Sequence, residues 1–318
     1  MSPQPPDRHD AAGEIGIVWA LYAAVAVEIL VTYSRLPWNQ LYHVTGSGIE
    51  GGASRALLFL NFPMALAAIA LLLILLDRLT GDVERGLALL AIVLCLAVVW
   101  PKMVDQAKLD ARPANAIAAI GVAFAFGLTV WSARRGLLGR LGRQAGDRVR
   151  IAIGVVLVAL GLPWMAADLG FSFDGVPVLG TLYQTGELRT QPNLAGFHPA
   201  VHHGHHHGMD GILLVATVLL LSRLLPSVRA RGLRGVTGAY LALLLCYGAG
   251  NIANDFWLEQ VVKRGWTLWE VPDVTTPKAS VAWLVIVLAA AALWVLLVLP
   301  TVRRPAPLQA GRSTTATP

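Results

Sequence analysis

The sequence predicts an all-α membrane protein, a polytopic bundle of about eight transmembrane helices with both termini in the cytoplasm. Hydrophobic residues make up 56% of the 318 residues and charged residues only 14%, and the mean hydropathy is +0.61. These values lie well outside those of a soluble globular domain. Apolar stretches of roughly 20 residues, the length that crosses the hydrocarbon core of a bilayer, recur along the chain between polar links.

Eight such stretches follow one another, and each is predicted to form one membrane-spanning helix. Helix ends inferred from a hydropathy pattern are accurate to about two to four residues. The predicted spans are Glu14–Leu36, Ala56–Leu76, Gly86–Val104, Ala114–Ser132, Val149–Leu169, Met209–Leu225, Gly235–Trp257 and Ala279–Leu299.

The spans divide the chain into a short cytoplasmic tail (1–13), a transmembrane domain (14–300) and a disordered cytoplasmic tail (301–318). The first apolar segment is long and lacks a small-residue cleavage site, so it reads as a retained span and not as a signal peptide. Long extracytoplasmic loops are expected at 37–55, 170–208 and 258–278. Cys95 and Cys246 fall inside apolar spans, and no structural disulfide is expected.

Positive charges predict the orientation of the bundle, because links rich in Lys and Arg stay in the cytoplasm. The two tails and the links at 77–85, 133–150 and 223–234 together hold 16 basic residues, all of them Arg. The opposite side holds nine, spread over longer loops. The net charge of +6 is therefore an orientation signal and does not indicate a nucleic-acid partner. Functional residues are expected on the outward loops.

Histidines are concentrated just before the sixth predicted span, where six of the eight lie within ten residues. We call residues 198–207 the histidine loop. A cluster of imidazoles indicates affinity for a transition metal such as iron, copper or zinc. The alternative is a solvent-exposed tract that binds ions loosely, as a purification tag does. The six are His198, His202, His203, His205, His206 and His207.

Spacing within the loop suggests how a metal would be held. If the segment is helical, His203, His207 and Asp210 project from one face, because they are four and three residues apart. Two imidazoles and one carboxylate can bind a metal and leave coordination positions open. The other histidines form a second face, for another ion or for half of a binuclear centre. Gly204 and Gly208 favour instead a tight ligand loop.

Acidic residues accompany the loop. Four aspartates are predicted to lie where the third, fifth, sixth and seventh spans reach the outer surface, a depth at which ionisable groups are costly and usually functional. Asp168 and Asp255 are expected to complete or support the metal site, and Asp105 to support it from further away. The four are Asp105, Asp168, Asp210 and Asp255.

Further polar residues are candidates for orienting the ligating imidazoles. Asn251, Asn254 and Glu259 lie close to Asp255 along the seventh span, so their side chains can reach inward together. The alternative is that they join helices by hydrogen bonds. Glu28, in the outer half of the first span, is expected in the same polar layer. His43 is the other outward-loop histidine and is a candidate ligand from the opposite half of the chain.

The residues from His198 to His203 resemble, over six positions only, the HxxxHH box of membrane fatty-acid desaturases and hydroxylases. Those families distribute their histidines over several separate boxes on the cytoplasmic side, whereas this chain concentrates them in one outward segment. The pattern therefore does not indicate membership. The chain contains no nucleotide-binding glycine loop, no Ser-His-Asp signature and no c-type haem motif.

Together these patterns predict a multi-pass protein of the plasma or bacterial inner membrane that binds a transition metal. We expect a metal-dependent oxidoreductase or hydroxylase that acts on a lipid or another hydrophobic small molecule at the outer leaflet. The alternatives are a transition-metal transporter and a noncatalytic metal-binding or assembly protein. Runs such as Ala65–Leu76 and Ile212–Leu221 contain almost no polar side chain, which disfavours an ion route across the bilayer.

Overall fold

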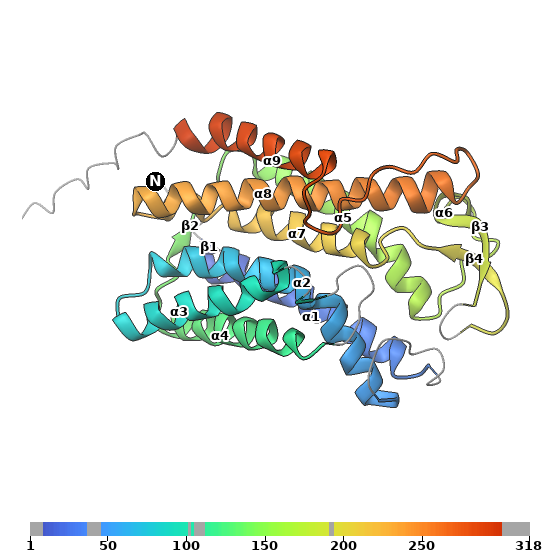
Figure 1. The fold of residues 1–318 in the computed structure, drawn as a ribbon, viewed down its shortest axis with the longest axis horizontal. Helices are drawn as coiled ribbons and strands as arrows, with labels where there is room; N and C mark the ends of the chain where they lie inside the picture. The colour runs from blue at the N-terminus through green and yellow to red at the C-terminus, as the bar shows by residue number, and fades with distance from the viewer. Residues whose placement is uncertain (1–8, 37–45, 101–102, 105–111, 191–193, 301–318) are drawn as a thin grey trace, which may run out of the picture.

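A computed structural model describes residues 9–36, 46–100, 103–104, 112–190 and 194–300. Within these residues the chain is mainly helical, and most helices run along the long axis of one elongated bundle (Figure 1). The helices are α1 (Ala11–Tyr33), α2 (Gly48–Leu76), α3 (Asp82–Cys95), α4 (Ala114–Arg134), α5 (Asp147–Asp168), α6 (Leu179–Tyr183), α7 (His207–Leu221), α8 (Arg231–Phe256) and α9 (Val281–Leu293).

In the part of the chain that the structure describes, two small antiparallel pairs of strands lie at opposite ends of the bundle (Figure 1). Strand β1 (His9–Asp10) pairs with β2 (Arg140–Leu141), and β3 (Gln184–Arg189) pairs with β4 (His198–Val201). We call the end that carries β3 and β4 the histidine end, and the end that carries β1 and β2 the arginine end. Helices α1 and α5 finish at the histidine end, whereas α2 and α7 begin there.

Helix α2 forms the centre of the bundle. It is apolar on all sides, as expected of a helix with no solvent-facing stripe, and it packs against α1, α3, α4, α7 and α8. Nearly all of its side chains from Leu58 to Leu75 are buried. Helix α7 packs most extensively against α8, and α9 lies against the outer side of α8. This arrangement brings residues of α2, α5 and α8 against the histidine loop, which leads into α7.

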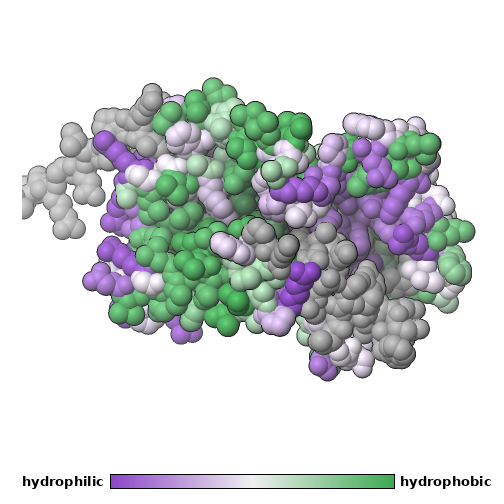
Figure 2. Space-filling model, viewed as in Figure 1, coloured by the Kyte–Doolittle hydropathy of each residue, from purple (hydrophilic) through white to green (hydrophobic). Residues whose placement is uncertain are grey.

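Within the described residues, six helices are long and apolar enough to cross a membrane: Ala11–Tyr33, Gly48–Leu76, Ala114–Arg134, Asp147–Asp168, Arg231–Val262 and Val281–Val298. The outer helices α5 and α9 expose large aliphatic side chains such as Val155 and Leu288, which suits contact with lipid. Figure 2 shows hydrophobic residues over much of the left part of the visible face and hydrophilic residues gathered toward the right part. The prediction of an all-α bundle is confirmed, and six of its helices are compatible with a membrane by length and composition in the part of the chain that the structure describes.

The other two predicted spans correspond to shorter helices. Helix α3 ends at Cys95 and continues as a 3-10 turn over Leu96–Val99, and α7 is the shorter apolar helix His207–Leu221. The helical part of α8 is extended by π-helical turns over Trp257–Val262, and α9 by those over Trp294–Val298. The outward loop expected from residue 258 therefore begins as a continuation of α8.

Helix α2 begins at Gly48, so residues 48–55, which the sequence places in a loop, are helical. Two adjacent glycines in this stretch suggest a loop, but they serve close helix packing instead. A Cβ added at Gly52 would lie 2.6 Å from the carbonyl oxygen of Leu30 in α1. The early start also carries Arg55 into the bundle, where it is buried and its guanidinium lies 5.3 Å from the ring centre of Tyr33.

The two cysteines are free, as the sequence predicts. Cys95 is buried in α3 and Cys246 is half-buried in α8. Both occupy positions of small apolar residues in helix contacts.

A histidine loop packed inside the bundle as candidate functional site

The histidine loop connects strand β4, which ends at Val201, to helix α7, which begins at His207. Gly204 has a φ of +88°, and a Cβ at this position would lie 2.8 Å from the carbonyl oxygen of Leu160 in α5. Only glycine can therefore occupy this position without strain or a steric clash. His206 also has a positive φ, +47°, which is uncommon for a residue with a side chain and marks local strain.

This turn shows that one expectation was wrong. The helix does not extend back to His203, so His203 does not share a helical face with His207 and Asp210. The positive φ angles at Gly204 and His206 are incompatible with a right-handed helix over these residues, so α7 begins only at His207. His207 and Asp210 do share the first turn of α7, where the His207 Nδ1 lies 3.9 Å from the Asp210 Oδ2.

The imidazole rings form a continuous row inside the bundle. The ring centres of His202 and His205 are 5.9 Å apart, those of His205 and His206 are 6.0 Å apart, and those of His206 and His207 are 3.8 Å apart. These four histidines are half-buried, and His203, which is not part of the row, is buried. The loop is therefore packed against the helices and is not an extended tract.

Aromatic side chains from three helices enclose the row. The ring centre of Trp164 in α5 lies 5.5 Å from that of His205, and the ring centre of Phe59 in α2 lies 5.3 Å from that of His206. Phe256 of α8 packs edge-on against His203 at 5.5 Å. Trp164 and Phe59 also stack on each other at 5.8 Å. The sequence does not predict that these aromatics belong to the site, because nothing in the spacing of residues on separate helices indicates that they meet.

Helix α8 supplies carboxylates beneath the loop. The Oδ2 atom of Asp255 lies 2.9 Å from the Nδ1 of His203 and accepts a hydrogen bond of 2.8 Å from the backbone N–H of Gly204. One turn further along, the Oε2 of Glu259 lies 3.4 Å from the Nδ1 of His202 and 2.5 Å from the Nζ of Lys263. The structure thus brings Asp255 and Glu259 to the histidines, as the sequence suggested.

Several buried ring nitrogens of the loop have no hydrogen-bond partner within the described part of the chain. They are the Nε2 atoms of His203 and His206 and the Nδ1 atom of His207. A buried polar atom left without a partner costs about 1–3 kcal/mol, so each such atom requires an explanation, and an ion is one of the usual ones. As the described side chains stand, no three of His, Cys, Asp and Glu converge on one point as a metal cage would require.

Burial keeps the half-buried histidines of the loop neutral. Desolvation, together with the positive charges of Lys263 and Arg189, lowers the pKa of His202 to about 4. Desolvation likewise lowers the pKa of His205 to about 3 and that of His206 well below its ordinary value. Neutral imidazole is the form that carries a free lone pair for a metal or for a hydrogen-bond donor.

His198 stands apart from the other loop histidines. Its Nδ1 lies 2.6 Å from the Oδ2 of Asp174, and its Nε2 lies 2.8 Å from the carbonyl oxygen of Ala195. The hydrogen bond to Asp174 raises the pKa of His198. Both ring nitrogens are therefore engaged, and the residue holds strand β4 to the preceding loop. Asp174 was not singled out by sequence analysis.

The remaining sequence candidates occupy several places. Glu28 accepts a 3.0 Å hydrogen bond from the Oγ1 of Thr32, which also lies 3.3 Å from the backbone carbonyl of Asp168, so both acids lie where α1 and α5 end. Asn251 donates to the Tyr247 carbonyl at 2.9 Å. Asn254 donates to the Pro272 carbonyl at 3.4 Å. His43 and Asp105 fall outside the described residues.

Comparison with known proteins provides no relative for this chain. No family model, no curated protein and no solved structure matches it. The site must therefore be interpreted from its own chemistry.

Proposed function

We propose that this chain is an integral membrane metalloprotein that holds a transition-metal ion at the histidine loop and acts there as an oxidoreductase or hydroxylase on a hydrophobic molecule. The observation that carries the proposal is the set of buried imidazole nitrogens at His203, His206 and His207 that have no hydrogen-bond partner among the described residues. Six helices of membrane-spanning length provide the setting. A soft or borderline metal ion is the ligand that imidazole nitrogens accept most readily.

The donor set fits such an ion in composition. His206 and His207 present neighbouring rings, and Asp210 adds a carboxylate from the first turn of α7. His203 offers its Nε2 while its Nδ1 faces Asp255, the arrangement by which a carboxylate fixes the tautomer and orientation of a ligating imidazole. We assign His202 and His205 to the binding of a second ion. Because the side chains do not yet converge, ion binding includes rotation of these rings.

The surroundings favour chemistry on an apolar substrate. Trp164, Phe59 and Phe256 give the loop apolar walls and limit the access of water. A bound iron, copper or zinc ion supplies a Lewis acid that activates water or oxygen or polarises a substrate oxygen. The protein keeps the imidazoles neutral, orients His203 through Asp255 and keeps the site apolar.

Metal analysis of the full-length protein tests the proposal. The protein is purified in detergent with an affinity tag that contains no histidine, dialysed, and analysed for iron, copper and zinc by mass spectrometry. We expect close to one or two ions per chain, with most of this metal lost in the double variant His206→Ala/His207→Ala. The matched control is His198→Ala, which should retain its metal because both ring nitrogens of His198 are already engaged.

Two results would contradict the proposal. One is metal that dialysis removes, and the other is equal metal content in the His206→Ala/His207→Ala and His198→Ala variants. Saturable uptake of labelled metal into proteoliposomes would indicate a transporter instead of an enzyme. Full metal content without redox activity toward lipid substrates would favour a noncatalytic metal-binding or assembly protein.

The proposal includes eight membrane crossings with both termini in the cytoplasm, so that the histidine end faces outward. The excess of Arg at the opposite end supports this orientation. In a background in which Cys95 and Cys246 are replaced by Ala, a cysteine at Ser172 should react with an impermeant maleimide in whole cells, whereas a cysteine at Ala145 should react only after the membrane is opened. The reverse pattern would place the loop in the cytoplasm.

A further inference from the structure

A large apolar cavity runs along the bundle between helices α1, α5 and α7. Its volume is about 1340 Å³, above the roughly 300–1,000 Å³ of pockets for drug-sized ligands. Its walls come from all three helices, for example Leu21 of α1, Val158 of α5 and Ala216 of α7. Val155, Val158 and Leu162 are more than half exposed, so the cavity opens sideways toward the space that a bilayer would fill.

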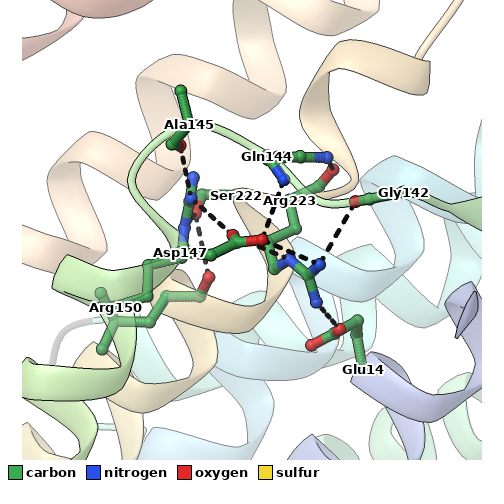
Figure 3. Close-up of polar contacts among 9 residues, drawn as sticks. Glu14, Gly142, Gln144, Ala145, Asp147, Arg150, Ser222 and Arg223 are labelled. Carbon is green, nitrogen blue, oxygen red and sulfur yellow. Dashed lines mark hydrogen bonds and ion pairs between the residues drawn. The ribbon is translucent and has the colours of Figure 1, made fainter. Parts of the chain in front are cut away.

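Charged residues line this cavity at the arginine end. Figure 3 shows Arg223, in the turn that follows α7, between Glu14 of α1 and Asp147 of α5. Arg223 forms an ion pair with Glu14 and another with Asp147, whose Oδ1 is 3.2 Å from its Nε. Arg150 donates to Asp147 at 3.1 Å and to the hydroxyl of Ser222 at 3.2 Å. Both carboxylates of this cluster are therefore already paired with arginines.

Two more arginines line the same end of the cavity, Arg143 and Arg148. Both are exposed, and within the described part of the chain neither side chain has a hydrogen-bond or ion-pair partner. The lining thus contains four arginines and two acids, an excess of two positive charges. Two free guanidinium groups beside an apolar crevice match a ligand with an anionic head and a hydrocarbon tail.

We propose that the cavity binds an anionic phospholipid, with its phosphate at Arg143 and Arg148 and its acyl chains between α1, α5 and α7. Guanidinium groups bind phosphate through paired, charge-assisted hydrogen bonds, and the aliphatic walls cover the hydrocarbon. Gly154 leaves the α5 wall open, because a Cβ at this position would meet nothing within 4 Å. A helix of a second copy would fill the apolar part but would leave the two charges without a partner.

The experiment uses the full-length protein in detergent with phosphatidylglycerol and phosphatidylcholine of the same acyl chains as probes. Bound lipid is counted by native mass spectrometry, and affinity is measured from the dependence of the melting temperature on lipid concentration. We expect the anionic lipid to bind with one-to-one stoichiometry and more tightly than the zwitterionic one. In Arg143→Gln/Arg148→Gln its affinity should fall roughly ten- to thirty-fold.

Two further variants separate the two halves of the site. Arg229→Gln/Arg231→Gln removes the same charge from exposed positions that do not line the cavity, and it should bind phosphatidylglycerol as the unmodified protein does. Gly154→Leu fills the crevice without changing charge, and it should weaken binding of both lipids.

Equal affinity for the two lipids, or an Arg143→Gln/Arg148→Gln variant that binds phosphatidylglycerol unchanged, would overturn the proposal. So would a dimer that dissociates when Gly154 is replaced by Leu, which would assign the crevice to a second copy. The metal content of the Arg143→Gln/Arg148→Gln variant should stay unchanged, because both arginines lie at the opposite end of the bundle from the histidine loop.

Discussion

His198 and His203 belong to one short segment, yet their surroundings give them different roles. His198 is tied by both ring nitrogens to Asp174 and to the Ala195 carbonyl. His203 is buried against Phe256, faces Asp255 through Nδ1 and leaves Nε2 without a partner in the described part of the chain. His198 therefore holds strand β4 in place, whereas His203 has the features of a metal ligand.

Sequence alone could identify the histidines but not this division of roles. Asp174 lies 24 residues before His198, and no spacing rule connects them. The break of the helix at Gly204 and His206 depends on the carbonyl of Leu160 in another helix, which leaves no room for a side chain at residue 204. The chemistry-bearing residue types were therefore predictable, whereas their grouping depends on tertiary contacts.

The pair of His198 and Asp174 should make the β3–β4 hairpin sensitive to pH. Its hydrogen bond raises the pKa of His198 and, together with a bond from Gln184, lowers that of Asp174. The histidine contribution is complete below the unfolded pKa of about 6.5 and is lost as pH rises through the raised folded value. The aspartate contribution is present above about 3.9 and is lost as pH falls through its lowered folded value.

Hydrogen exchange of the hairpin amides, expressed as protection factors, checks this expectation. Protection should be greatest between about pH 4 and 6.5 and should fall toward pH 8. Arg189, which faces His198 in the strand register and pairs with Glu187 at 2.6 Å, keeps its charge over this range. In His198→Asn the fall toward pH 8 should disappear. A fall of equal size in that variant would show that another group is responsible.

At the scale of elements, the existence and order of the membrane helices follow from hydropathy, but their contacts do not. The apolar stretches are nearly uniform around the helix, so the sequence does not indicate which face meets which neighbour. Small residues determine which helix faces meet. Helices α7 and α8 approach closely at Gly211, where a Cβ would lie only 2.5 Å from the carbonyl oxygen of Gly248. Such contacts join helices in lipid.

The substitution Gly211→Ala should therefore separate α7 from α8 and destabilise the bundle by about 1–3 kcal/mol. Because α7 carries His207 and α8 carries Asp255, the same change should weaken metal binding. The control is Gly250→Ala, whose Cβ would meet the Ile286 Cδ1 at an ordinary 3.6 Å. Thermal unfolding in detergent measures both variants. A Gly250→Ala protein less stable than Gly211→Ala would refute this account of the packing.

At the scale of the molecule, the bundle has one end rich in histidine and acid and another rich in arginine. The sequence predicted this polarity, because it depends only on which links carry which residues. It did not predict the apolar crevice, whose walls combine α1, α5 and α7 from separate parts of the chain. The histidine loop and the arginines proposed to hold the phosphate lie at opposite ends of the bundle, so a metal ion and a lipid headgroup can be bound at the same time.

The central claim is that imidazole nitrogens of the histidine loop hold a metal ion. X-ray absorption spectroscopy of the bound metal, in full-length protein purified without a histidine tag, tests it most directly. The account predicts nitrogen ligands at about 2.0–2.1 Å with the outer-shell scattering of imidazole rings, and loss of this signal in His206→Ala/His207→Ala but not in His198→Ala. A spectrum with oxygen ligands only, or one that is identical in the two variants, would contradict the account.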